Sequence, residues 1–374
     1  MNTPLTRPSA TLSRRERDLR VRPSHPSPSA RRCRSAADEG LGIFVFVLAA
    51  FFAAPISAQS IASTANGIVI AHDNVIELQG GWSVAGVKNP GRIIVGNSRV
   101  AVLDPIANEL RVVDLESGRA QHFATGETPI DGLFIGRDFF IIERNARTLE
   151  RCGADGTTAS IDTAADPAFI REANGLIYVY ARVAGMLHEI DPRTMKITRE
   201  TRVAPFATDM ELDDGNAYLV DARTAKMHVV DLATLKAQED IEVGVVPVDM
   251  AFVKGPTPIS ARTLAVADPS AKRVWVVEGV QSLTQAVTRG FLRGLLGAGL
   301  FSRGASQFPT GVDRVFIRGS RWIAYDSASG TLYSFTKTKS TPIAKDVGPN
   351  AFALTAGGVV WWDNAVRRLQ KLPD

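Results

Sequence analysis

Carboxylates recur in this chain at one position of a repeated pattern, and they are its best candidates for chemistry. Each follows a proline by a few residues and opens a short apolar run; they are Asp131, Asp209, Asp249 and Asp313. The same position in the other repeats holds Arg92, Phe169 and Ala351. Clustered carboxylates can hold a hard cation such as Ca²⁺, or a cationic or polyhydroxyl ligand with Arg92 as counter-charge. They can also be purely structural, because an Asp in this position often accepts N–H bonds from its own turn.

Other reactive residue types show no catalytic spacing. The histidines after residue 58 fall in separate repeats, and no paired His or Cys spacing typical of a transition-metal site occurs. The sequence also lacks a G-x-S-x-G elbow and a P-loop. The aspartates therefore carry the only enzyme hypothesis. We expect a binding protein rather than an enzyme, with no firm cofactor and Ca²⁺ as the one ion that the carboxylates could take.

The elements that position these residues form a repeat of about 40 residues. It is marked by Pro90, Pro129, Pro167, Pro205, Pro247, Pro309 and Pro349. After each proline come an apolar run, a turn and a second apolar run, which mostly ends in an acid. These acids are expected to form turns; they are Asp104, Glu143, Asp221, Asp268, Asp326 and Asp363. Since the best copies add a third and a fourth run, the repeat predicts four-stranded propeller blades.

Seven prolines predict an all-β, seven-bladed β-propeller that forms one domain over residues 59–374. The last copy, from Pro349 to Asp374, is too short for four strands. We expect the N-terminal excess over residues 66–87 to supply the missing outer strand or strands. Pairing of the N- and C-terminal strands in one blade would then close the ring and leave no free sheet edge.

One repeat carries a family resemblance. The stretch "KMHVVDLATLKAQEDIEVGVVPVDMAF" (Lys226–Phe252) resembles the repeat of YVTN-type seven-bladed propellers, which are related in fold to lactonase-type propellers. The resemblance implies an extracytoplasmic propeller. Because lactonase-like relatives use channel acids, sometimes with a metal, it also implies the alternative of a lactonase-like hydrolase. A third reading, an accessory partner of a periplasmic redox enzyme, rests on the resemblance alone.

Residues 1–58 read as a leader with a signal peptide. An Arg-, Ser- and Pro-rich region precedes the apolar run "LGIFVFVLAAFFAA" and small residues before a cut after Ala58. An uncleaved anchor is the alternative, although the run is short for a membrane span. We expect a periplasmic or secreted protein. The leader holds nine Arg and four acids, so the rest of the chain has a net charge near −1, which argues against nucleic acid as a partner.

The stretch "RGFLRGLLGAGLF" (residues 289–301) lies in the one long spacing between prolines. We place a fourth strand near Leu283–Thr288 and an insertion over 291–308, on the same face as the aspartates. An alignment that closes the repeat at Gly304 instead puts the insertion on the opposite face. Its glycines disfavour a free helix, so it reads as a packed loop, a lid or partner-docking element, or a peripheral membrane contact; the contact residues would be Phe291, Leu292, Leu295, Leu296 and Phe301.

Together these features predict an exported, monomeric propeller that works as a binding or accessory module. Its partner would be a protein or a small ligand at the face that carries Arg92 and the aspartates.

Overall fold

The fold is described from a computed structural model. It describes residues 60–72, 74–213, 215–238, 240–253, 262–280, 303–318, 321–336, 339–355, 358–363, 366 and 368–372. The chain divides into two compact units, residues 1–54 and 55–374, and every described residue belongs to the second. The predicted leader and signal peptide (1–58) therefore lie outside the described residues and stay a prediction. No helix that is long and apolar enough to span a membrane occurs in these described ranges.

The described residues form eight antiparallel sheets that follow one another in chain order. Blade 1 contains β1 (Ser60–Thr64), β2 (Gly67–His72), β3 (Val75–Leu78) and β4 (Ser83–Ala85). Blade 2 contains β5 (Ile93–Val95), β6 (Arg99–Asp104), β7 (Glu109–Asp114) and β8 (Ala120–Ala124). Blade 3 contains β9 (Pro129–Ile135), β10 (Asp138–Glu143), β11 (Thr148–Cys152) and β12 (Thr158–Asp162). Blade 4 contains β13 (Pro167–Ala173), β14 (Leu176–Ala181), β15 (Met186–Asp191) and β16 (Lys196–Arg202).

The second half repeats this plan with small variations. Blade 5 contains β17 (Asp209–Leu212), β18 (Asn216–Asp221), β19 (Lys226–Asp231) and a split outer strand, β20 (Lys236–Ala237) and β21 (Ile241–Glu242). Blade 6 contains β22 (Asp249–Val253), β23 (Arg262–Asp268), β24 (Arg273–Val280) and β25 (Arg303–Gln307). Blade 7 contains β26 (Arg314–Arg318), β27 (Arg321–Asp326), β28 (Thr331–Phe335) and β29 (Ser340–Ala344). Blade 8 contains β30 (Phe352–Thr355), β31 (Gly358–Asp363) and β32 (Arg368–Leu372).

The prediction of seven blades is wrong, because the residues before the first marker proline build a blade of their own. Strands β1 to β4 pair only with one another, and β30 to β32 form a separate three-stranded sheet. The ring closes by packing between these two blades, not by strand pairing. The Ile61 N–H donates to the Asn350 carbonyl at 2.9 Å, and Ile61, Ile70 and Val360 form a small apolar cluster. Counting prolines missed blade 1 because the proline before its first strand, Pro55, falls within the predicted leader and was not counted.

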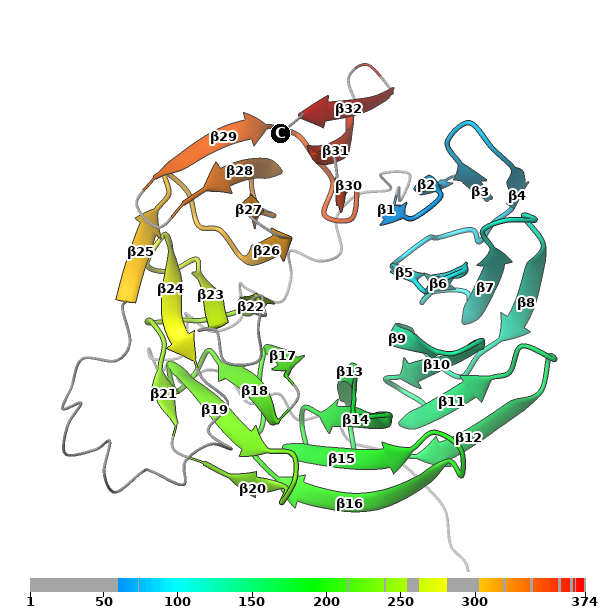
Figure 1. The fold of residues 1–374 in the computed structure, drawn as a ribbon, viewed down its shortest axis with the longest axis horizontal. Coiled ribbons are helices and arrows are strands. Elements are labelled where there is room, and N and C mark those ends of the chain that lie inside the picture. The colour runs from blue at the N-terminus through cyan, green and yellow to red at the C-terminus, as the bar shows by residue number, and fades with distance from the viewer. Residues whose placement is uncertain are drawn as a thin grey trace, which may run out of the picture. The chain divides into compact units, whose positions relative to one another are not determined.

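The first strand of each blade is the innermost one. Figure 1 shows β1, β5, β9, β13, β17, β22, β26 and β30 around the central opening, with the later strands outside them. The first strands of successive blades also contact one another from β1 to β26, and β30 contacts β1. Residues at the start of these strands therefore meet at one mouth of the channel, together with the loop before each first strand and the turn between the second and third strands. We call this the mouth face.

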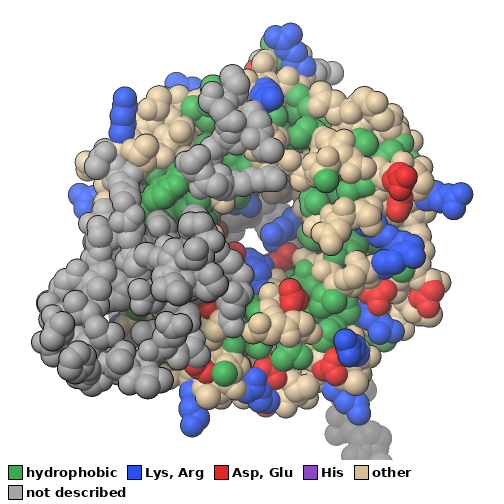
Figure 2. Space-filling view, viewed as in Figure 1, with side chains coloured by type: hydrophobic (Ala, Val, Ile, Leu, Met, Phe, Trp, Pro, Cys, Tyr) green, Lys and Arg blue, Asp and Glu red, His purple; other side chains and the backbone are tan. Residues whose placement is uncertain are grey.

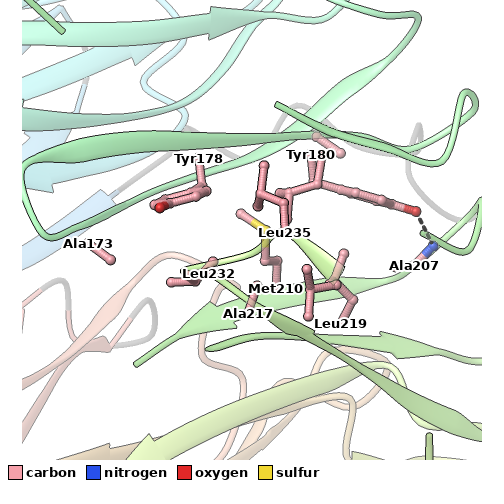
Figure 3. Packing of buried hydrophobic residues seen from close by; sticks show 12 residues of the cluster. Ala173, Tyr178, Tyr180, Ala207, Met210, Ala217, Leu219, Leu232 and Leu235 are labelled. Atoms are coloured by element: carbon pink, nitrogen blue, oxygen red, sulfur yellow. Dashed lines mark hydrogen bonds between the residues drawn. The ribbon is translucent and has the colours of Figure 1, made fainter. Parts of the chain in front are cut away.

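The hydrophobic core lies between neighbouring blades. In the cluster of Figure 3, Tyr178 and Tyr180 of β14 pack against Met210 of β17 and Leu219 of β18. The strand alternation explains this arrangement, because Tyr218, next to Leu219, belongs to the following cluster between blades 5 and 6. The Tyr180 hydroxyl accepts the Ala207 N–H at 3.0 Å, and burial raises the pKa of Tyr180 to about 12.

The acids that end the second strands cap the turns, as predicted. Asp104, Asp221, Asp268, Asp326 and Asp363 each accept a backbone N–H from the turn that follows, at 2.8–3.2 Å. Glu143 differs, since it accepts the Gly126 N–H, from the loop before β9, at 2.6 Å. Asp104 and Asp268 also accept N–H groups from the loop before the first strand. Asp104 and Asp268 thus tie the turn of their blade to the neighbouring loop of the mouth face.

The fourth strand of blade 6 lies later in the chain than predicted. Strand β25, not a strand near Leu283–Thr288, pairs with β24, from Arg273 with Gln307 to Val277 with Arg303. The two ends that the intervening segment joins, Val280 and Arg303, lie at the end of the blade opposite Asp249. This agrees with the alignment that closed the repeat at Gly304. The predicted contact residues, Phe291, Leu292, Leu295, Leu296 and Phe301, lie outside the described residues.

A pair of glycines in blade 4 tests whether the turns of the mouth face determine stability. Gly185 and Gly175 both have positive φ, 63° and 77°. A Cβ on Gly185 would meet the Pro205 backbone nitrogen at 2.8 Å, whereas one on Gly175 would meet nothing within 4 Å. Gly175→Ala should lower the free energy of unfolding by about 1 kcal/mol through backbone strain alone. Gly185→Ala should lower it by a further 1–3 kcal/mol, roughly, through the steric conflict. Urea unfolding measures both changes. Equal losses of unfolding free energy would show that the loop at Pro205 moves away from the added methyl group at no cost.

Candidate binding site at the channel mouth

The predicted site residues all lie at the mouth of the channel. Asp131 is in β9, Asp209 and Asp249 begin β17 and β22, and Arg92 and Asp313 directly precede β5 and β26. Figure 2 shows acidic and basic side chains bordering the opening at the centre of the ring. The repeat thus positions these groups as the sequence predicted, and their partners decide what they can do.

Arg171 of β13, in blade 4, connects the acids of blades 3 and 5, and sequence reasoning missed it. Its guanidinium Nη1 donates to Asp131 Oδ2 at 3.0 Å and its Nη2 to Glu211 Oε1 at 3.2 Å. The same Nη2 lies 3.7 Å from Asp209 Oδ1. Burial alone would lower the pKa of Arg171, but the carboxylates of Glu211, Asp131 and Asp209 raise it above its ordinary value. Arg171 therefore stays charged within the channel.

A sequence signal for Arg171 and Glu211 does exist. Each lies two residues after a position already singled out, Phe169 and Asp209, inside an innermost strand. Side chains two apart on a strand point to the same side. A charged residue at that spacing therefore extends the charged surface of the mouth one step further along the strand.

Asp209 and Asp249 each accept a backbone N–H from the next blade. The Met250 N–H donates to Asp209 Oδ2 at 3.0 Å, and the Val315 N–H donates to Asp249 Oδ2 at 2.7 Å. Burial raises the pKa of Asp209, although Arg171 opposes the shift. Burial and then the nearby Asp209 carboxylate raise the pKa of Asp249 well above its ordinary value. Both acids are therefore held where ionisation is unfavourable.

The remaining two predicted residues have different partners. Arg92 Nη1 donates to Asp131 Oδ1 at 2.6 Å, so Asp131 bridges Arg92 and Arg171. Asp313 accepts the Ser327 N–H at 3.1 Å and the Ser327 hydroxyl, both from the turn of its own blade. Asp313 thus follows the purely structural alternative.

Every junction between neighbouring blades carries a polar contact at the mouth, and we call this set the polar belt. In order around the ring, its contacts are Ser60–Gly91, Arg92–Asp131, Asp131–Arg171, Arg171–Glu211, Asp209–Met250, Asp249–Val315, Arg314–Pro349 and Asn350–Ile61. Five of these contacts use a carboxylate or guanidinium of an innermost strand to bond the next blade. Four charged residues that were predicted to bind a ligand therefore bond neighbouring blades to one another; they are Arg92, Asp131, Asp209 and Asp249.

The Ca²⁺ hypothesis stays a prediction. Within the described ranges, no group of three or more His, Cys, Asp or Glu side chains is arranged to hold a metal ion. The carboxylates of the belt are instead directed to separate partners, namely guanidinium groups and backbone N–H groups.

Comparisons with known proteins place the chain among β-propellers. No protein-family model and no curated protein sequence matches it. Among solved structures, it is similar to the dihydro-heme d1 dehydrogenase NirN in complex with DHE, with a TM-score of 0.58 at 10% identity over 86% of this chain and 74% of that one. It is also similar to BamB from Moraxella catarrhalis, with a TM-score of 0.55 at 13% identity over 81% and 92% of the two chains. A chain of a mitotic checkpoint complex gives 0.56 at 10% identity over 75% and 86%. At such identities the likeness shows the fold alone.

Removing each arginine of the belt should have very different effects. Arg171→Gln leaves three acids of blades 3 and 5 without their cation, and breaking a buried ion pair from one side costs about 3 kcal/mol or more. The Arg92 side chain is 53% exposed, so Arg92→Gln should cost about 1 kcal/mol or less. Urea unfolding of both variants measures the difference. Equal losses of unfolding free energy in the two variants would show that Arg171 does not stabilise the belt more than Arg92 does.

Asp249 should make the protein less stable as the pH rises. Its pKa is raised in the folded state, so the folded protein holds a proton that the unfolded chain loses above about pH 4. The free energy of unfolding should therefore fall from about pH 4 up to the folded-state pKa of Asp249. Asp249→Asn removes this ionisation while keeping an oxygen for the Val315 N–H. The difference between the two proteins, measured by urea unfolding at several pH values, should grow with pH; a constant difference would contradict the raised pKa.

Proposed function

We propose that this chain is an exported β-propeller that binds a protein partner through its mouth face. The apolar run at Leu41–Ala54 and the basic region before it support export. The YVTN-like repeat over Lys226–Phe252 supports an extracytoplasmic setting. The mitotic checkpoint complex, a protein assembly by name, shows that a propeller of this shape is compatible with such a role.

The observation that carries the proposal is the distribution of exposed apolar side chains. Among the described residues, eight large hydrophobic residues are exposed. Five of them lie in loops or turns of the mouth face: Ile106, Val183, Phe206, Val245 and Val366. Single exposed hydrophobic residues are ordinary, but a set gathered on one face around a charged channel is typical of an interaction surface.

The belt favours binding over the hydrolase alternative. A carboxylate that acts as a general base or a nucleophile must be within reach of a substrate. Asp131 already bonds two guanidinium groups, and Asp209 and Asp249 bond backbone N–H groups of the next blade. These acids hold the ring in one shape, which suits a rigid platform for a partner.

Photo-crosslinking from paired positions in blade 2 tests the proposal. Ile106 lies in the turn after β6 on the mouth face, and Val95 ends β5 at the opposite face; both are exposed. With p-benzoylphenylalanine in place of either residue, the full chain is expressed in its own organism and irradiated, and adducts are identified by mass spectrometry. We expect one recurring partner from Ile106 and Val183 and none from Val95. The proposal fails if no mouth position gives an adduct, or if Val95 gives the same one.

A further inference from the structure

A compact group of arginines and apolar side chains lies on the mouth face of blades 3 to 5. Arg144 follows β10, Arg182 and Val183 follow β14, Phe206 precedes β17, and Arg223 lies in the turn after β18. We call these five residues the arginine–phenylalanine patch. Its members come from adjacent loops: the Phe206 N–H donates to the Arg182 carbonyl at 2.8 Å, and Val183 is the next residue in the chain after Arg182.

One carboxylate serves two of the three arginines. Arg144 Nε lies 3.1 Å from Asp166 Oδ1, and Arg182 Nε lies 2.8 Å from Asp166 Oδ2. The two guanidinium groups therefore lie close together on one carboxylate, and burial, followed by the positive charge of Arg182, lowers the pKa of Arg144. Two guanidinium groups thus share one carboxylate, and this part of the patch has a net positive charge.

Arg223 extends the charge toward Phe206. Its Nη2 donates to the Pro205 carbonyl at 2.6 Å, and its guanidinium carbon lies 4.3 Å from the centre of the Phe206 ring. Its nearest carboxylate, Asp221, is 3.6 Å away and is occupied in capping its own turn. A guanidinium has five N–H donors, so Arg223, with 52% of its side chain exposed, can still offer donors to a ligand.

Phe206 differs from its counterparts in side chain and not in backbone, because Thr128 and Asp166, in the corresponding loops of blades 3 and 4, also have positive φ. The φ of Phe206 is 67°, a region that Gly or Asn adopts far more readily than an aromatic residue. Phe206 is 43% exposed, so its burial is incomplete as well. An aromatic side chain that is exposed on this turn is available as a contact for a ligand.

We propose that the arginine–phenylalanine patch binds an acidic segment of the protein partner; this rests on the proposed function. Carboxylates of the segment would accept paired N–H groups from Arg144, Arg182 and Arg223. An apolar side chain between those carboxylates would pack on Phe206 and Val183. The charge of the patch selects an anionic partner, and the apolar residues among the arginines favour a peptide over a nucleic acid or a lipid surface.

The test measures binding of a labelled peptide of alternating Glu and Tyr to the propeller by fluorescence anisotropy at about 0.15 M salt. Arg182→Gln and Arg223→Gln should each weaken binding about tenfold, as loss of one charge-assisted hydrogen bond implies. Phe206→Gly preserves the turn conformation and should also weaken binding. The control is Arg137→Gln, which changes an exposed arginine in the turn between β9 and β10, on the opposite face. Thermal unfolding midpoints confirm that each variant is folded.

The proposal is overturned if Arg137→Gln weakens binding as much as the patch variants do, or if a Gln–Tyr peptide binds as tightly. It is also overturned if an oligonucleotide or anionic vesicles bind as tightly, with the same dependence on the patch. Crosslinking separates this proposal from the proposed function. If Ile106 still captures the partner in Arg182→Gln, and the peptide ignores the patch, only the present inference fails. If the peptide depends on the patch but no mouth position captures a protein, the proposed function fails and the patch stands as a site for acidic ligands.

Discussion

The polar belt is the interaction on which the rest of the structure depends. Stacked blades bury apolar faces against one another, but such packing is non-directional. The belt adds a directional contact at each of the eight junctions, and Arg171 alone connects blades 3, 4 and 5. The contacts of the buried charges, Asp131, Asp209 and Asp249, have exacting geometry, since a buried charge without its partner is costly. Register between blades, channel shape and the position of the mouth loops therefore follow from one ring of contacts.

The sequence was informative about the existence and pattern of the repeat, and less informative about the number of blades. Because marker prolines precede innermost strands, positions such as Asp131, Asp209 and Asp249 were placed correctly at the mouth. Blade 1 escaped detection because the proline before β1, Pro55, falls within the residues assigned to the leader. The partners of the aspartates were not predictable either. A bond from Asp249 to the Val315 N–H joins residues 66 positions apart, and no local pattern specifies which backbone group a carboxylate will face.

The mouth face divides its charged residues into two kinds. Near the channel, guanidinium groups and carboxylates neutralise each other or bond backbone N–H groups, and their role is internal. Farther out, Arg144, Arg182 and Arg223 share too few carboxylates, and Phe206 and Val183 stand exposed beside them. A rigid inner ring with an unbalanced outer rim suits recognition, because the rim is held in a fixed shape before any partner arrives.

The junction between blades 8 and 1 has a consequence for how the ring is made. The Ile61 N–H donates to the Asn350 carbonyl. The face of blade 1 that packs against blade 8 therefore stays uncovered until blade 8 has been synthesised. A ribosome or a translocation channel delivers the N-terminal blade first, and every intermediate length of chain leaves two blade faces without a neighbour. Completion of the circle is therefore a single late event that depends on β30 to β32. Premature termination near residue 340 would remove β30 to β32. The ring would then lose the blade that closes it against blade 1, and not merely one-eighth of its residues.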